Sequence, residues 1–291
     1  MEKIQTAIDK ARAARTAVAG GVAPAAVVAS PSPASPSPAT PSPAISATAP
    51  AVSEMAAAWA ALQPFTPDMA RLRAQRVVTL GGGKDAVPFD MMRTKVIQQM
   101  RANGWRRLAI TSPTPACGKS TIALNLAFSL ARQTELRTIL AELDLRRPTM
   151  AKVLGTRSRV GFASVLEDRA DFAEVALRHG DGLALALNDG PVRNPAELLH
   201  GSSVAAALTA IETRYAPDLM IFDMPPMLVS DDVMAFMGHV DAVLLIAAAE
   251  TTTVKEIDAC ERELATQTNV MGVVLNKCHY MGREYGYGYY G

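Results

Sequence analysis

The residues best suited to chemistry lie at positions 108–125, which read Leu-Ala-Ile-Thr-Ser-Pro-Thr-Pro-Ala-Cys-Gly-Lys-Ser-Thr-Ile-Ala-Leu-Asn. The apolar residues 108–110 are typical of a short buried strand, and the Pro-rich residues after them are typical of a turn. From Ile122 to Leu130, apolar residues recur at helical spacing. The sequence therefore predicts a strand, a loop and a helix, with Gly118-Lys119-Ser120 where the loop becomes helix.

Gly118, Lys119 and Ser120 are the residue types that a phosphate-binding loop needs at that place. Unpaired backbone N–H groups and the positive end of the helix dipole favour phosphate oxygens. Gly118 lets the backbone approach closely, Lys119 reaches the β- and γ-phosphates, and the Ser120 hydroxyl ligates Mg²⁺. We therefore predict a P-loop that binds a nucleoside triphosphate, although Pro113 stands at the template's first glycine.

Two acidic residues follow apolar strand patterns elsewhere in the chain. Asp223 comes after Leu-Met-Ile-Phe, and Asp144 ends a second strand of the same kind. Mg²⁺ takes an octahedron of oxygens and keeps several waters, so carboxylates on neighbouring strands suit it. Either aspartate alone could cap a helix, but the two together in a P-loop domain predict a metal-organising role.

The chain of 291 residues alternates strand and helix patterns, which predicts an α/β fold of the P-loop NTPase type. We expect a mostly parallel sheet with helices on both faces and ligands at the carboxyl ends of its strands. Strands are predicted at 108–110, 137–143, 183–187, 219–222, 242–248 and 270–275. Helices are predicted at 89–100, 150–154, 162–167, 194–199, 202–215 and 253–266, besides the P-loop helix.

Composition divides the chain into four parts. Residues 1–18 have the pattern of a short amphipathic helix, and residues 19–86 are predicted to be a disordered, Ala/Pro/Ser-rich linker. The folded P-loop domain is predicted at 87–278, and residues 279–291 form a tail without a helix or strand pattern. Tyr280, Tyr285, Tyr287, Tyr289 and Tyr290 lie in that tail, although the chain has only 6 tyrosines.

Charge and cysteine usage narrow the class of protein. The 29 Lys and Arg nearly balance the 28 Asp and Glu, which argues against a protein that coats nucleic acid. The 3 cysteines have no metal-site spacing, and their odd number fits a reducing compartment. No apolar run approaches the ~18 residues of a membrane span. We therefore expect a cytoplasmic protein.

These motifs, in this order, resemble the bacterial tyrosine kinases, P-loop kinases that control capsule and exopolysaccharide production. The resemblance covers roughly residues 89–291. It rests on the loop 111–121, the acidic motif 142–148, the acidic motif 221–226, the stretch 194–199, the strand 273–276 and the tyrosine tail.

The resemblance implies an ATP- and Mg²⁺-dependent protein-tyrosine autokinase, in which Lys119, Asp144 and Asp223 are catalytic. The implied nucleotide-binding residues are Ala116, Cys117, Gly118, Lys119, Ser120, Thr121 and Asn276, the last near the adenine. The implied metal site comprises Ser120, Glu142, Asp144 and Asp223. The tail tyrosines Tyr280, Tyr285, Tyr287, Tyr289 and Tyr290 are the implied autophosphorylation sites.

The resemblance also implies partners. These are a membrane-embedded polysaccharide chain-length regulator that activates the kinase, a second copy of the chain that is phosphorylated in trans, and a cognate tyrosine phosphatase. No nucleic-acid partner is expected. The protein would then be cytoplasmic and peripheral at the inner face of the plasma membrane, through its partner.

Three departures from the family pattern stand out. Ala116 replaces a usual glycine, and Glu142 replaces a usual aspartate. The Glu-x-x-Arg-x-x-Arg helix for self-association appears only as residues 90–96, Asp-Met-Met-Arg-Thr-Lys-Val.

Two other functions fit the P-loop. An ATPase switch of the partition and septum-placement class would carry a lysine four residues before Gly118, where this chain has Thr114. A regulatory scaffold could bind nucleotide without kinase activity. Neither alternative requires a tyrosine-rich tail.

Overall fold

The computed structural model describes residues 49–157 and 160–278. These residues belong to a compact unit that begins at Ala47. The predicted N-terminal helix at residues 1–18 and the tyrosine tail at 279–291 lie outside the described residues.

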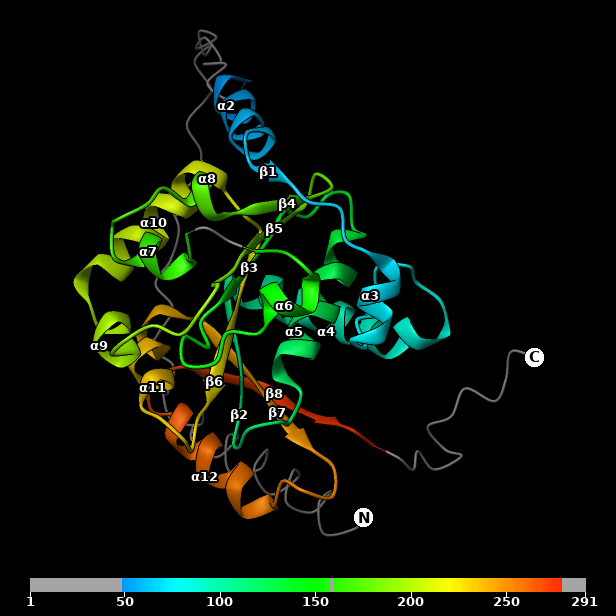
Figure 1. The fold of residues 1–291 in the computed structure, drawn as a ribbon. Helices are drawn as coiled ribbons and strands as arrows, with labels where there is room; N and C mark the ends of the chain where they lie inside the picture. Colours follow the sequence, from blue (N-terminus) through cyan, green and yellow to red (C-terminus); the bar gives the residue numbers. More distant parts are fainter. Residues whose placement is uncertain (1–48, 158–159, 279–291) are drawn as a thin grey trace, which may run out of the picture. The chain divides into compact units, whose positions relative to one another are not determined.

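An eight-stranded sheet runs through the described part of the chain, in the order β1-β4-β5-β3-β6-β2-β7-β8 (Figure 1). All neighbouring strands are parallel except β4 and β5, which are antiparallel. The predicted mostly parallel sheet is thereby confirmed. The strands are β1 (Gln63–Pro64), β2 (Arg107–Ser112), β3 (Thr138–Glu142), β4 (Leu177–His179), β5 (Leu183–Ala186), β6 (Leu219–Pro226), β7 (Ala242–Ala248) and β8 (Asn269–Asn276).

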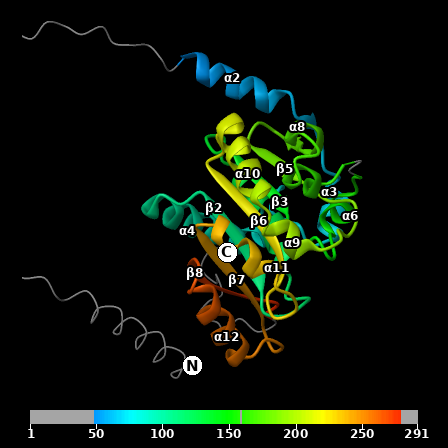
Figure 2. The same ribbon diagram turned by 90° about the vertical axis from the view of Figure 1, so that its left-hand side faces the viewer.

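Helices cover both faces of the sheet, as Figures 1 and 2 show. One face carries α3 (Met69–Ala74), α4 (Val87–Asn103), α5 (Lys119–Ala131) and α6 (Met150–Leu154). The other face carries α2 (Ala49–Ala60), α7 (Phe162–Leu166), α8 (Phe172–Val175), α9 (Pro195–Leu199), α10 (Ser202–Tyr215), α11 (Asp232–Phe236) and α12 (Val254–Leu264). Two single 3₁₀ turns, η1 (Lys84–Ala86) and η2 (Met237–His239), precede α4 and follow α11.

Alternation along the strands builds the two cores. In β2, Leu108 and Ile110 enter the core under α5, whereas Ala109 enters the core on the opposite face. Successive side chains of a strand point to opposite faces, so a strand buried on both sides is apolar throughout. This is why the central strands could be predicted as short apolar runs.

Helix ends follow local sequence signals. Gly104 adopts a left-handed conformation, φ 67°, and ends α4 directly after Asn103. Thr253 begins α12 with a capping box in which its side chain and Glu256 each bond the other's backbone N–H. These two helices and the identical bounds of α6 and α10 confirm their predictions.

The N-terminal boundary of the domain differs from the prediction. Residues 19–86 were expected to be a linker, but the chain is helical at Ala49–Ala60, and residues from the end of this helix onward pack against the domain. Trp59 donates from Nε1 to the carbonyl of Tyr215 at 2.7 Å, and Leu62, Leu72 and Val77 are buried. The linker prediction is therefore wrong from Ala49 onward, because isolated apolar residues find partners on a domain far along the sequence.

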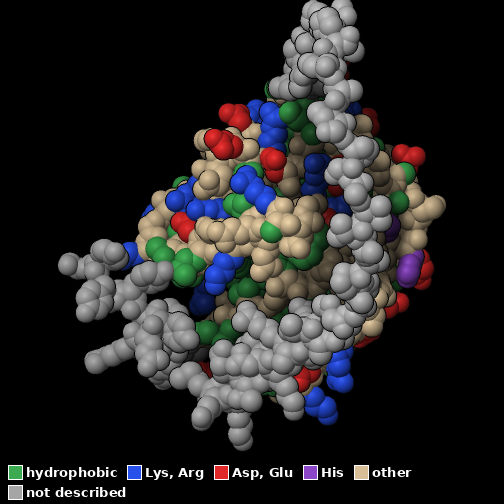
Figure 3. Space-filling model, turned by 180° about the vertical axis from the view of Figure 1, so that it is seen from behind, with side chains coloured by type: hydrophobic (Ala, Val, Ile, Leu, Met, Phe, Trp, Pro, Cys, Tyr) green, Lys and Arg blue, Asp and Glu red, His purple; other side chains and the backbone are tan. Residues whose placement is uncertain are grey.

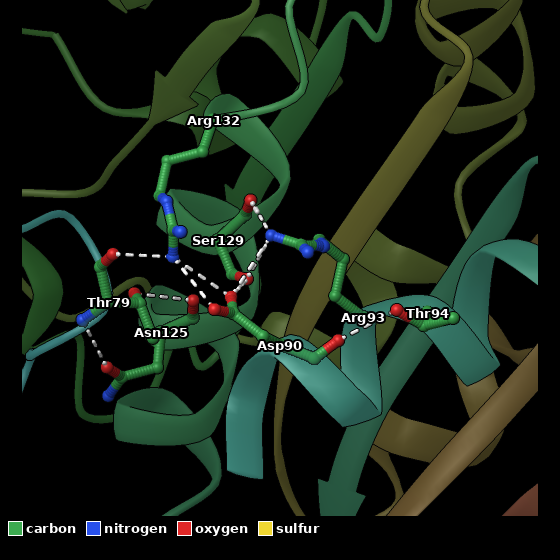
Figure 4. Close-up of polar contacts among 7 residues, drawn as sticks. All are labelled: Thr79, Asp90, Arg93, Thr94, Asn125, Ser129 and Arg132. Carbon is green, nitrogen blue, oxygen red and sulfur yellow. Dashed lines mark hydrogen bonds and ion pairs between the residues drawn. The ribbon is translucent and has the colours of Figure 1, made fainter. Parts of the chain in front are cut away.

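Residues 65–83, which we call the strap, run from β1 to η1 along the P-loop helix. The buried side chain of Asn125 in α5 holds this segment. Its Oδ1 accepts from the N–H of Val78 at 2.8 Å and of Thr79 at 3.3 Å, and its Nδ2 donates to the carbonyl of Arg76 at 2.9 Å. The Thr79 hydroxyl donates back to the Asn125 carbonyl at 2.8 Å (Figure 4). These four hydrogen bonds hold the strap against α5.

Candidate functional site

The predicted P-loop connects β2 to α5 at the carboxyl ends of the central strands. Two of its residues have left-handed backbones, Ala116 with φ 64° and Gly118 with φ 94°. A Cβ atom on Gly118 would lie 2.3 Å from Nδ2 of Asn276, so only glycine fits there. The loop therefore combines a strained alanine with an obligatory glycine, directly before Lys119 begins the helix.

Cys117 and Asn276 support the loop from behind. Asn276 donates from Nδ2 to the Cys117 carbonyl at 2.8 Å. The buried thiol of Cys117 lies 3.2 Å from the Thr114 carbonyl and 3.6 Å from the Thr252 hydroxyl. Burial opposes ionisation, but these hydrogen bonds outweigh it and lower the pKa of the thiol. Both side chains thus brace the loop, and contact of Asn276 with adenine stays a prediction.

Lys119 and Asp144 form an ion pair across the site. The Lys119 Nζ lies 2.8 Å from Oδ2 of Asp144, and both side chains are largely buried. Burial opposes the charge of Lys119, but the carboxylates of Asp223 and Asp144 outweigh it and raise the pKa of the lysine. The other Asp144 oxygen accepts from the N–H of Arg147 at 3.0 Å. The structure thereby brings together two residues predicted from separate motifs.

Asp223 is a fully buried carboxylate in β6. Neither of its oxygens has a hydrogen-bond partner among the described residues. Burial raises its pKa to about 7, although the nearby charge of Lys119 and the neighbouring Ser120 hydroxyl oppose the shift. The Ser120 hydroxyl does not complete a hydrogen bond to the carboxylate. A buried carboxylate without a donor is energetically unfavourable unless a ligand completes it. This orphaned group is the feature expected of a residue that holds a water of hydrated Mg²⁺.

Glu142 has a different set of contacts from the one expected of a metal ligand. Its Oε1 accepts from the N–H groups of Thr149 at 2.6 Å and Met150 at 2.8 Å, and its Oε2 accepts from the N–H of Asn188 at 3.0 Å. Burial raises its pKa against the effect of these bonds. Glu142 therefore fastens the start of α6 and the end of β5. Its longer stem, compared with aspartate, reaches these amides.

A cavity of about 680 Å³ opens over the P-loop. Ala116, Gly118, Lys119, Ser120, Thr121 and Asp144 line it, together with Arg146 and Arg147 of the acidic motif 142–148. Two further cations at the cavity, Arg76 and Lys277, lie outside the P-loop and the acidic motifs. Arg146 is bound by its guanidinium to the buried carboxylate of Asp232, at 2.6 and 2.9 Å. The cavity is therefore basic, as a site for a polyphosphate should be.

The residues at this cavity fit a hydrated Mg²⁺ held jointly with phosphate. In the described part of the chain, no group of three Asp, Glu, His or Cys side chains converges to hold a metal ion alone. Mg²⁺ is commonly bound through one or two carboxylates plus substrate phosphates. The Ser120 hydroxyl, Asp144 and the orphaned Asp223 are suited to that sharing.

Comparison with known proteins agrees with this geometry. Residues 108–283 match the family model described as the CobQ/CobB/MinD/ParA nucleotide binding domain. The chain is 32% identical over 188 residues to the tyrosine-protein kinase YwqD of Bacillus subtilis (strain 168), a match that covers 64% of this chain and 78% of YwqD. The chain belongs to the bacterial tyrosine kinase family.

Solved structures of bacterial tyrosine kinases share the fold. The kinase domain of Escherichia coli ETK matches with a TM-score of 0.62 and 25% identity, over 71% of this chain and 82% of that domain. The tyrosine-protein kinase wzc of Salmonella typhimurium is 29% identical over 186 residues. That match covers 63% of this chain but only 26% of wzc, so the chain spans about a quarter of that longer relative.

The remnant of the bacterial tyrosine kinase self-association helix lies on α4 and points inward. Asp90 accepts from the Ser129 hydroxyl at 2.5 Å and from Arg132 at 3.0 Å, and Arg93 donates to both the carbonyl and the hydroxyl of Ser129 (Figure 4). These contacts tie α4 to α5 within one chain. The acid and the arginine are thus engaged internally, in a motif that the family uses between chains according to the resemblance.

Proposed function

We propose that this chain is an ATP-dependent protein-tyrosine autokinase that phosphorylates its own tail at Tyr280, Tyr285, Tyr287, Tyr289 and Tyr290. The observation that carries the proposal is the orphaned carboxylate of Asp223 beside the Lys119–Asp144 pair. In a chain of the bacterial tyrosine kinase family, this arrangement suits phosphoryl transfer, where positioning and charge stabilisation supply most of the rate.

The P-loop would hold the phosphates of ATP. Ala116 and residues 118–121 line the cavity, and Lys119 would exchange its bond to Asp144 for the β- and γ-phosphates. That exchange frees the Asp144 carboxylate at the moment the substrate is bound. The Lys119–Asp144 ion pair would therefore belong to the nucleotide-free protein and would be broken when ATP binds.

Asp144 would take part in both proton transfer and metal binding, whereas Asp223 would serve the metal alone. Asp144 lines the cavity, where a tyrosine substrate would enter, whereas Asp223 is fully buried. We assign Asp144 to accept the hydroxyl proton while the tyrosine oxygen bonds to the γ-phosphorus and the bond to the departing ADP oxygen breaks. Ser120, Asp144 and Asp223 would hold Mg²⁺, which neutralises charge on the phosphates.

Glu142 acts in this proposal as a positioning residue. It connects β3 to the first amides of α6, and so fixes the loop that carries Asp144, Arg146 and Arg147. We therefore propose that Glu142 supports the metal site and does not bind the metal, in contrast to the role that the resemblance implies.

The biological setting is proposed on the resemblance. The kinase would regulate exopolysaccharide or capsule synthesis and export, with a membrane-embedded chain-length regulator as activator and a tyrosine phosphatase to reverse its modification. Among the described residues, no helix has the length and apolar character to cross a bilayer. A cytoplasmic position at the inner face of the membrane would therefore depend on the partner.

Incubation of the pure full-length chain with ATP and Mg²⁺ tests the activity. We expect phosphotyrosine on the wild-type chain and none on Lys119→Met. The variant should stay folded, because its amine contributes to one ion pair at the cavity rather than to the core. Phosphotyrosine at the wild-type level on the pure Lys119→Met chain would remove the P-loop from the mechanism.

A further inference from the structure

Arg76, in the strap, lies at the rim of the P-loop cavity. Its side chain lines the same space as Lys119, Ser120 and Lys277. The hydrogen bonds and ion pairs of the described residues engage the Arg76 carbonyl but not its guanidinium. The strap thus brings a cation from outside the P-loop and carboxylate motifs to the place where phosphates would bind.

The backbone at Arg76 is held in an unfavourable conformation. Its φ is 61°, in the left-handed region that residues with a Cβ atom rarely adopt. The buried amide of Asn125 holds this turn, because its Nδ2 bonds to the carbonyls of both Arg76 and Thr121 at 2.9 Å. Thr121 is part of the first turn of the P-loop helix, so Arg76 is mounted directly on that turn. Strain of this kind persists where the surrounding structure enforces it, often at functional sites.

The other arginines of this segment have different surroundings. Arg71 donates to the carbonyls of Lys152 and Val153 and so anchors α3 to α6. Arg73 is exposed and is not among the residues that line the cavity. Arg76 is therefore placed differently from two arginines of the same strap, and Arg73 offers a matched control.

Two of the cations at the cavity are already paired with carboxylates, whereas the guanidinium of Arg76 is not. Lys119 is paired with Asp144, and Arg146 is paired with Asp232. The P-loop lysine and one arginine of the acidic motif are thus neutralised by carboxylates before a ligand arrives, whereas Arg76, Arg147 and Lys277 have no carboxylate partner among the described residues. A polyphosphate gains more from a cation whose charge no carboxylate already offsets.

We propose that Arg76 is a phosphate-contacting residue of the nucleotide site, supplied by the strap of the same chain. The proposal rests on the function proposed above and deepens it. The planar guanidinium can bind two phosphate oxygens at once, which lysine cannot reproduce.

The decisive variant is Arg76→Gly in the full-length chain. Glycine relaxes the left-handed backbone, so we expect the melting temperature without nucleotide to equal or exceed that of wild type. The dissociation constant for a fluorescent ATP analogue with Mg²⁺ should rise about tenfold or more, as expected on loss of a charge-assisted contact. A purely structural role for Arg76 would not give higher stability together with weaker nucleotide binding.

Two further variants separate the contact from general electrostatics. Arg76→Lys should recover only part of the affinity, since it keeps the charge and loses the fork. Arg73→Ala removes the same charge from the same segment and should bind nucleotide as wild type does. Wild-type affinity in Arg76→Gly, or equal weakening in Arg73→Ala, would overturn the role of Arg76. Failure of the wild-type chain itself to bind the analogue would instead refute the nucleotide site as a whole.

Discussion

Asp223 is placed to suit a ligand, and its burial lowers the stability of the nucleotide-free protein at neutral pH. Its carboxylate is fully buried without a donor among the described residues, and burial raises its pKa to about 7 from 3.8. In the folded chain it therefore holds a proton at pH values where the unfolded chain has released it. The stability that this protonation provides is present below about pH 4 and is lost as the pH rises through about 7.

Asp223→Asn should remove this pH dependence. A pKa change of this size corresponds to roughly 4 kcal/mol, so the variant should gain up to about that much over wild type by pH 8 and little at pH 4. Denaturant unfolding of both nucleotide-free chains across this range measures the difference. Parallel stability curves for the two chains would show that Asp223 is not buried as described.

Ala116 is a second residue whose local conformation departs from its preference. It has a φ of 64° in the phosphate loop, where the family usually has glycine. Ala116→Gly should raise the free energy of unfolding by about 1 kcal/mol, because the left-handed backbone disfavours a Cβ atom. Thermal unfolding without nucleotide checks this, with a lower melting temperature as the contrary result.

At the scale of elements, Glu142 joins three segments that the sequence shows as separate. Its carboxylate serves the amides of Thr149, Met150 and Asn188, at the start of α6 and the end of β5. Glu142→Asp draws the carboxylate back by about 1.5 Å. We expect a loss of stability of about 1–3 kcal/mol, because buried amides lose their acceptor. Equal unfolding midpoints for Glu142→Asp and wild type would contradict this positioning role and favour Glu142 as a metal-site residue.

The strap and α2 belong to the domain rather than to a linker, and truncation tests this. A chain that begins at residue 47 should unfold near the wild-type temperature. A chain that begins at residue 87 loses Trp59, Leu62, Leu72 and Val77 from two cores, and each buried side chain contributes about 1.5–3 kcal/mol. We expect the shorter chain to be destabilised by several kcal/mol or to aggregate. Equal melting temperatures for both truncated chains would contradict this and support a linker that extends to residue 86.

The elements that could be predicted from sequence are those whose signals are local. The apolar run of β7, the Gly104 stop of α4 and the Gly118-Lys119-Ser120 turn each depend on adjacent residues. The strap could not be predicted, because Leu72 and Val77 are isolated apolar residues whose partners lie on α5 and beyond. The contacts of Glu142 could not be predicted either, since they depend on how the chain before α6 folds back toward β3 and on Asn188 beyond the neighbouring strand β5. Nor could Arg76 be predicted, because its place at the cavity depends on the contact between its carbonyl and Asn125, far along the chain.

At the scale of the molecule, the face shown in Figure 3 carries mixed rather than segregated charge. Lys, Arg, Asp and Glu side chains are interspersed over the part of the surface visible in Figure 3. This agrees with the near balance of 29 basic and 28 acidic residues. The basic groups that we place in function are those at the P-loop cavity, where they face a phosphate ligand. The inward contacts of Asp90 and Arg93 leave association between chains to other surfaces or to a partner.

Phosphoryl transfer between two inactive variants of the chain is the most direct test that the P-loop site phosphorylates the tyrosine tail. One chain carries Lys119→Met and an intact tail, and the other ends at residue 278 and keeps Lys119. Each is incubated with ATP and Mg²⁺ alone and then mixed, and phosphotyrosine is mapped by mass spectrometry. We predict none in either chain alone, and in the mixture phosphotyrosine at Tyr280, Tyr285, Tyr287, Tyr289 or Tyr290 of the Lys119→Met chain. A mixture that hydrolyses ATP without forming any phosphotyrosine, beside a wild-type chain that also forms none, would contradict the kinase and favour an ATPase.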